Sequence, residues 1–133
     1  MKTKHGTTNY RTLKPFIDVV KRNDGHMRFT AEGFMDLSIE DLFRKDRFGN
    51  DVFAIAHYGE QNGDAMADPD MEFSIDETNK RIIPRTFQND YIGLYQQVFR
   101  NGDATYSPRL LIDLDEFLWQ WLKNIEMQGF KPE

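Results

Sequence analysis

The last third of the chain carries a stripe of large apolar residues at steps of three and four. The stripe consists of Leu110, Leu111, Leu114, Phe117, Leu118, Trp121, Leu122 and Ile125. This spacing places the side chains on one face of an α-helix. Ser107-Pro108 suits the start of such a helix and Gly129 suits its end. Because a one-sided helix must bury its apolar face, the rest of the chain has to supply a layer for it to pack against.

Earlier in the chain the apolar period is that of strands. Apolar and polar residues alternate in 35–40 and again in 71–76, as in strands with one buried and one wet face. The apolar run 52–58 predicts a central strand between them. Residues 81–83 predict a fourth strand, which Pro84 either ends or marks as an edge strand. The expected layer is an antiparallel sheet of about four strands.

The N-terminal region predicts a second helix. Leu13, Phe16, Ile17 and Val20 recur at helical spacing, which predicts a helix over 11–22. Residues 1–8 are polar and lack periodicity, so we expect a disordered N-terminal arm. The arm is followed by a single domain over 9–133. Its expected class is α+β, with the antiparallel sheet packed on an N-terminal helix and a long C-terminal helix.

Some segments admit two interpretations or give weak signals. Ser38 and Asp41 resemble a capping box, so a short helix over 39–44 competes with the strand there. Asn62-Gly63 is a strong turn signal, which 65–69 is expected to lengthen into a loop. Residues 91–99 favour a short helix.

Charge is distributed unevenly along a chain of net charge −5. Residues 1–28 contain seven Lys or Arg against two Asp, whereas 56–90 contain eight Asp or Glu against three Lys or Arg. Regions of one sign attract partners of the other, so the basic arm and the acidic middle predict two binding surfaces. The alternative is that both regions only solvate the domain.

Composition limits the compartment and the chemistry. The chain has no cysteine, which excludes disulfides, thiolate metal sites and cysteine nucleophiles. No apolar run approaches the roughly 18 residues that cross a bilayer, and the first residues have no apolar stretch typical of a secretion signal. We therefore expect a cytoplasmic protein with no membrane contact.

The candidate functional residues cluster in 57–72. They are His57, Tyr58, Glu60, Asn62, Asp64, Asp68, Asp70 and Glu72, with Asn89 and Asp90 added from a second polar segment. Oxygen ligands of this kind suit a hard divalent cation, so a metal site would use Asp64, Asp68, Asp70 and Glu72, with His57 as a further candidate ligand. The spacing does not match an EF-hand loop, and His57 has no second His at ligand spacing. The structural alternative is that these residues make turns and cap backbone N–H groups.

Other catalytic patterns are missing from the sequence. There is no glycine-rich phosphate loop, no nucleophile elbow and no His-Glu-x-x-His motif. Basic and aromatic residues interleave at Tyr10, Arg11 and Lys14. This pattern is found in nucleic-acid-binding proteins, and it is the basis for the alternative of nucleic-acid binding through the basic arm. We expect no cofactor.

Three separated motifs carry a resemblance to a known family. They are His57-Tyr58 with Gln61-Asn62-Gly63-Asp64, Met66, Asp68-Pro69, Met71 and Phe73; then Pro84 with Phe87-Gln88-Asn89-Asp90; and finally Trp121-Leu122 with Asn124-Ile125 and Gln128-Gly129. From about residue 30 onward the chain resembles an uncharacterised domain family of bacterial plasmids, conjugative transposons and phages. The resemblance implies a mobile genetic element as the setting and assigns no activity.

These observations favour a non-enzymatic accessory protein of a bacterial mobile element that acts through protein contacts, as an interaction or regulatory module. Two alternatives remain at this stage. One is a divalent-metal-dependent enzyme that uses the acidic segment 57–72. The other is a weak nucleic-acid binder that uses the basic arm.

Overall fold

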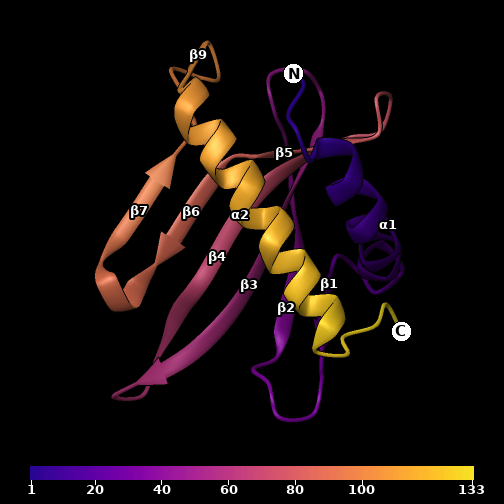
Figure 1. Cartoon of the computed structure of the whole chain (residues 1–133), viewed down its shortest axis with the longest axis vertical. Coiled ribbons are helices and arrows are strands. Elements are labelled where there is room, and N and C mark those ends of the chain that lie inside the picture. The colour runs from indigo at the N-terminus through magenta and orange to yellow at the C-terminus, as the bar shows by residue number, and fades with distance from the viewer.

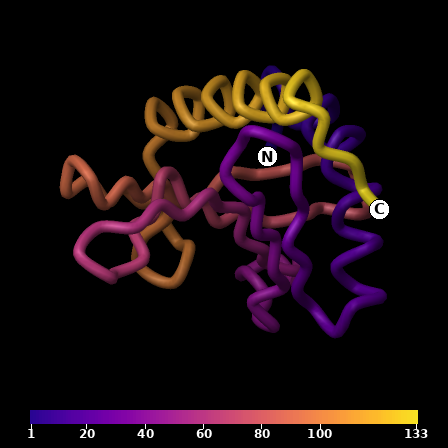
Figure 2. The backbone as a smooth tube through the Cα atoms, turned by 90° about the horizontal axis from the view of Figure 1, so that it is seen from below, coloured from indigo at the N-terminus to yellow at the C-terminus, as the bar shows by residue number.

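A computed structural model of the chain describes residues 1–133. Two helices lie against one face of a mainly antiparallel sheet, with α2 running diagonally across it (Figure 1). Seen from below, α2 forms a layer above the strands (Figure 2). The predicted α+β class is confirmed, and the sheet has seven strands rather than about four.

The helices are α1 (Gly6–Arg22) and α2 (Pro108–Met127), and a 3₁₀ turn, η1, covers Asp90–Ile92. The strands of the main sheet are β1 (His26–Phe29), β2 (Leu37–Lys45), β3 (Asp51–Gln61), β4 (Asp64–Asp76), β5 (Arg81–Pro84), β6 (Thr86–Asn89) and β7 (Leu94–Gln97). Their order is β1-β2-β3-β4-β6-β7, and β5 also pairs with β4. A small separate hairpin joins β8 (Phe99–Arg100) to β9 (Thr105–Tyr106).

The alternating residues of the central strands build the core, as predicted. Leu37, Ile39, Phe53, Ile55, Met71, Phe73 and Ile75 are all buried on the helix side of the sheet. Phe53 pairs directly with Phe73 across β3 and β4, with ring centroids 6.1 Å apart. The prediction for Met35 is wrong: β2 begins only at Leu37, and Met35 is 44% exposed.

Helix α2 packs its apolar stripe on this core. The Ser107 hydroxyl accepts a hydrogen bond from the Leu110 N–H and so caps the helix start, as its position before a proline predicted. Trp121 is buried, whereas Trp119 lies on the flank and stacks on His5. Phe117 is 39% exposed, but its ring meets that of Phe87 edge-on at 5.0 Å. The stripe therefore spans both the core and the margin of the sheet.

The N-terminal boundary differs from the prediction. Helix α1 begins at Gly6 rather than near residue 11, so part of the expected arm 1–8 is helical. Thr3 and His5 contact Asp115 and Glu116 of α2 through hydrogen bonds. A polar sequence without periodicity gave no sign of this order, because the partners that hold it are more than 100 residues away.

The hairpin of β3 and β4 is longer than predicted. Asn62 and Gly63 form its turn with φ of 52° and 85°, which confirms the Asn-Gly signal. However, β4 begins at Asp64, so the loop expected over 65–69 is strand. Residues 39–44 lie in β2, which excludes the capping-box helix there.

The predicted short helix over 91–99 is wrong. After the turn η1, Gly93 at φ 62° ends the helical geometry, and the chain returns as β7 alongside β6. Pairing with β6 overrides the weak helical spacing, because β6 offers a row of backbone groups that a lone helix would leave exposed. Neither α1 nor α2 combines the length and apolar character needed to span a membrane.

Candidate functional site

The face of the sheet opposite the helices, here called the open face, carries an acidic surface. Glu40, Asp70 and Glu72 alternate with core residues of β2 and β4, so their side chains point to this face. Ala54 of β3 pairs with Glu40 on one side and Glu72 on the other. Ala56 likewise lies between Ser38 and Asp70. The two alanines are buried in the central strand, and carboxylates lie on the strands on both sides of them.

Tyr58 and Asp70 form the centre of this surface. The Tyr58 hydroxyl donates a hydrogen bond of 2.7 Å to Asp70. Burial raises the pKa of the Asp70 carboxyl, and the charges of Glu72, Glu40 and Asp90 add to this effect against the opposing Tyr58 hydrogen bond. Burial and the same carboxylate also raise the pKa of Tyr58. The pair therefore lies in a field of concentrated negative charge.

Glu72 and Asp90 border this centre in different ways. The Glu72 carboxylate pairs with the exposed Arg44 guanidinium, which neutralises part of the surface. The Asp90 carboxylate accepts bonds of 2.8 Å from the Ala67 N–H and from the Gln88 side chain. These bonds lower the pKa of Asp90. Asp90 therefore adds a fixed negative charge.

Asp68 and Asn89 act as a structural link between β4 and β6. The Asn89 side chain donates to Asp68 at 3.3 Å and accepts from the Tyr91 N–H at 3.0 Å. These are the local roles that turn and cap chemistry predicts for such residues. The link holds the edge of the sheet beside Asp70.

Glu60, Asn62 and Asp64 lie outside the group formed by Glu40, Asp70 and Glu72. They lie at the exposed tip of the β3–β4 hairpin, where Gln61 pairs with Asp64. Asp64 is six residues from Asp70 along β4, roughly 20 Å at the rise of a strand. Asn62 and Asp64 therefore cannot act together with Asp70 within one molecule, whereas Glu60 lies two residues beyond Tyr58 on the same face of β3.

His57 points to the opposite face. Its ring nitrogen Nδ1 lies 3.0 Å from the Asp36 carbonyl, and the ring packs near Trp121 and Phe130 at 5.5 and 6.0 Å. His57 is buried. The residue closes the core under the end of α2 and does not face the acidic surface.

The predicted ligands do not assemble into a metal centre. No group of three or more His, Asp or Glu side chains in the chain lies close enough to hold one ion. Asp64 stands at the hairpin tip, Asp68 bonds to Asn89, and Glu72 bonds to Arg44. The geometry gives the metal-enzyme alternative no support.

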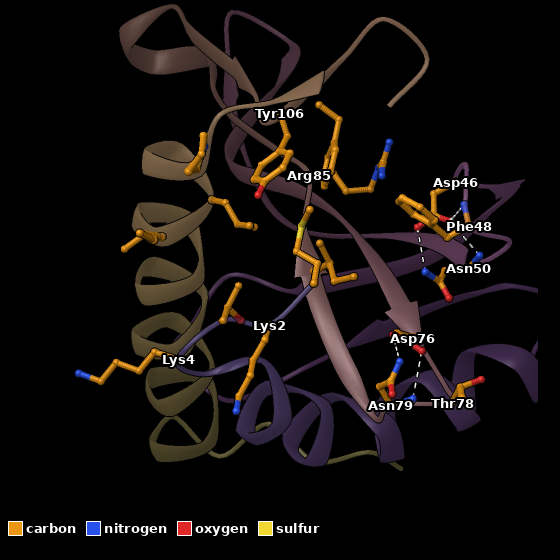
Figure 3. A pocket seen from close by; sticks show the side chains of 17 residues that line it. Lys2, Lys4, Asp46, Phe48, Asn50, Asp76, Thr78, Asn79, Arg85 and Tyr106 are labelled. Atoms are coloured by element: carbon orange, nitrogen blue, oxygen red, sulfur yellow. Dashed lines mark hydrogen bonds between the residues drawn. The ribbon is translucent and has the colours of Figure 1, made fainter. Parts of the chain in front are cut away.

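A separate pocket of about 790 Å³ opens at the end of the molecule where the N-terminus lies (Figure 3). Lys2 and Lys4 line one side of it, and Asp46, which follows β2, and Asp76, the last residue of β4, lie opposite. Both carboxylates accept hydrogen bonds within their own loops, Asp46 from the Phe48 and Asn50 N–H groups and Asp76 from Asn79. The two carboxylates of this pocket are thus already engaged.

The chain was compared with family models, with curated proteins and with solved structures. The family model described as a domain of unknown function, DUF6908, matches residues 9–131. This chain belongs to the DUF6908 family. No curated protein and no solved structure matches it. The DUF6908 match covers α2, the whole sheet and all of α1 except its first residues, so the acidic surface lies inside the family domain.

Sequence reasoning on this DUF6908 domain missed two residues of the open face. Glu40 belongs to the wet side of the 35–40 alternation and could have been included on that pattern alone. Tyr95, 58% exposed on β7, was hidden by the predicted helix over 91–99. Both lie near candidate residues only because β2 pairs with β3 and β7 pairs with β6.

Proposed function

We propose that this DUF6908 domain is a protein-interaction module whose open sheet face binds a basic segment of a partner protein. The single observation that carries the proposal is the acidic surface of Glu40, Asp70 and Glu72 on a sheet face that no helix covers. Negative charge on an exposed surface attracts basic partners and speeds their association.

Exposed tyrosines on the same face support a protein partner. Tyr58 and Tyr95 are 44% and 58% exposed. Tyrosine combines a large apolar ring with a hydrogen-bonding hydroxyl, and is enriched among the residues that contribute most to protein interfaces. Because Asp70 holds the Tyr58 hydroxyl, the ring is already oriented before a partner binds.

We further propose that the domain is an accessory protein of a bacterial mobile genetic element and acts in the cytoplasm. Support comes from the three motifs that resemble proteins of plasmids, conjugative transposons and phages, and from the absence of cysteine. A regulatory or accessory role fits an acidic sheet face with exposed tyrosines.

The test is a cross-linked pull-down from a bacterial host with quantitative mass spectrometry. A variant that combines Glu40→Gln, Asp70→Asn and Glu72→Gln removes the three carboxylates of the acidic surface. A matched variant combines Asp113→Asn, Glu126→Gln and Glu133→Gln, three exposed acidic residues on or after α2. We expect the first variant to recover at least about tenfold less partner than the wild type, and the second variant to recover as much as the wild type. Added salt should lower recovery by the wild type, because it screens the charges.

Equal recovery by the two variants, or no reproducible partner, would contradict the proposal. Recovery that depends on nucleic acid and on Lys2, Lys4 and Arg11, rather than on the open face, would instead support nucleic-acid binding through the N-terminal region.

A further inference from the structure

Strand β7 is an unprotected edge of the sheet. It pairs with β6 on one side, and no strand or helix lies along its other side (Figure 1). Its four residues Leu94–Gln97 include no charge and no proline. Proteins usually protect an edge with charged side chains, proline or a covering element, because open backbone groups recruit other strands.

The opposite edge of the sheet is protected. There, the side-chain amide of Asn23 donates to the His26 carbonyl at 2.7 Å, and β1 also carries the exposed Arg28. The contrast between β1 and β7 makes β7 the edge that is open to a further strand.

One hydrogen bond next to β7 shows which of its backbone groups point outward. The Val98 N–H donates to the Arg85 carbonyl, on the β6 side, at 2.8 Å. The N–H and C=O of one trans peptide point in opposite directions, so the Gln97 carbonyl faces away from β6. With the alternation of an antiparallel ladder, Tyr95 also presents its backbone groups outward.

The side chains of the same two residues lie on the open face. Tyr95 pairs with Gln88, which pairs with Asp70, and Gln97 pairs with Thr86. A small hollow of about 210 Å³ is lined in part by Glu72, Tyr95 and Gln97. Arg44 and Arg85 also line it, and each is paired with a carboxylate, Arg44 with Glu72 and Arg85 with Asp103. A residue opposite Tyr95 or Gln97 on an added strand would therefore point its side chain over this hollow toward the carboxylates.

We propose that β7 accepts an antiparallel strand from the partner, an extended segment in which lysine or arginine alternates with apolar residues. The main chain of that segment bonds to Tyr95 and Gln97, and its basic side chains extend over the open face toward Glu72 and Asp70. This inference rests on the proposed function and identifies the form of the partner segment. Strand addition of this kind takes affinity from the main chain and specificity from alternate side chains.

The probe is a synthetic eight-residue peptide in which lysine alternates with valine, titrated into the full chain. In an added antiparallel strand, residues opposite Tyr95 and Gln97 are lysines whose own N–H groups face β7. One peptide carries backbone N-methyl groups on its two central lysines, and an isomer carries them on its two central valines. We expect the lysine-methylated peptide to bind at least about tenfold more weakly than the parent and the valine-methylated isomer to bind within about threefold of it.

A pair of protein variants tests the same contact from the other side. Gln97→Pro removes an outward N–H, and Gln97→Val removes the same side chain but keeps that N–H. We expect only the proline variant to weaken binding about tenfold, with both variants keeping the wild-type melting temperature. In the complex, amide exchange should slow at Tyr95 and Gln97.

The outcomes separate this inference from the proposed function. If both methylated peptides and both Gln97 variants bind like the parents while the triple open-face variant loses binding, strand addition is overturned and the acidic surface stands. If the triple variant binds the peptide as wild type does, the acidic surface itself fails. A dimer of the free chain that Gln97→Pro dissociates would assign the edge to a second copy and also overturn the proposal.

Discussion

The Asp115 carboxylate on α2 accepts a hydrogen bond from the backbone N–H of His5 at 3.0 Å. It also accepts one of 2.6 Å from the Thr3 hydroxyl, and Asp115 is only 2% exposed. Beside it, the His5 ring lies parallel to Trp119 at 4.3 Å, and the Lys123 ammonium lies 4.3 Å from the centre of the same indole ring. These contacts fix the start of α1 on α2.

Replacement of Asp115 should release this anchor. We expect Asp115→Ala to lower the free energy of unfolding by about 2–3 kcal/mol, because it leaves the buried His5 N–H without an acceptor. Asp115→Asn keeps one oxygen acceptor and should cost less. Urea unfolding measures both, and Asp113→Ala on the exposed side of α2 is the control. Equal effects of Asp113→Ala and Asp115→Ala would contradict the anchor.

The raised pKa of Asp70 predicts a pH effect of known sign. The folded chain binds the Asp70 proton more tightly than the unfolded chain, so the resulting stability is complete below the unfolded pKa and is lost as pH rises through the folded pKa. Asp70→Asn keeps an acceptor for Tyr58 and removes this loss. We expect the variant to gain stability over wild type from about pH 4 upward, by less than about 1 kcal/mol because the side chain is half-buried. Parallel stability curves of the two proteins would show that Asp70 has no such effect.

Asn9 on α1 should be a site of easy stabilisation. Its side chain is 1% exposed, and neither amide atom has a hydrogen-bond partner in the protein. An unpaired buried polar group costs about 1–3 kcal/mol. Asn9→Leu, which has similar volume, should therefore raise the free energy of unfolding by about 1 kcal/mol in urea titrations. Asn9→Asp is the comparison, and it should destabilise; a loss of stability in Asn9→Leu would disprove the assignment.

The ion pair of Arg85 and Asp103 should contribute more to the free energy of unfolding than the exposed ion pairs do. Their atoms are 2.7 Å apart with side chains 13% and 15% exposed, and the guanidinium stacks over Phe99 at 4.7 Å. We expect Asp103→Ala to cost about 3 kcal/mol, because it leaves a nearly buried cation unpaired. Asn tolerates the local φ of 68° as Asp does, so Asp103→Asn removes the charge without straining the backbone. Comparison of the Ala and Asn variants therefore separates the backbone effect from the charge effect.

The exposed pair of Arg109 and Asp113 is the matched control for this experiment. Its side chains are 87% and 55% exposed. Asp113→Ala should change stability by less than about 1 kcal/mol, since solvent screens the pair. A similar cost for the Asp103 and Asp113 variants in urea unfolding would contradict the special role of the buried pair.

The elements predicted most accurately are those whose signal is local. The stripe in 110–125 and the alternation in 71–76 predicted α2 and the inner part of β4, because side-chain direction follows from the backbone period alone. The turn at Asn62-Gly63 followed from the tolerance of both residues for positive φ. The errors lie where contacts with a distant segment set the secondary structure. Leu94–Gln97 is a strand because it pairs with β6, and Gly6–Thr8 is helical next to residues that α2 anchors.

The candidate site shows the same division. The sequence by itself determined the residue types, the acidic character of 56–90 and the alternation in 71–76 that puts Glu72 on a wet face. Only the tertiary structure decided that Glu40 from β2 joins them, that His57 turns to the core and that the hairpin tip lies apart. The physical reason is that local periodicity fixes which way a side chain points, whereas strand order and register fix which distant side chains it meets.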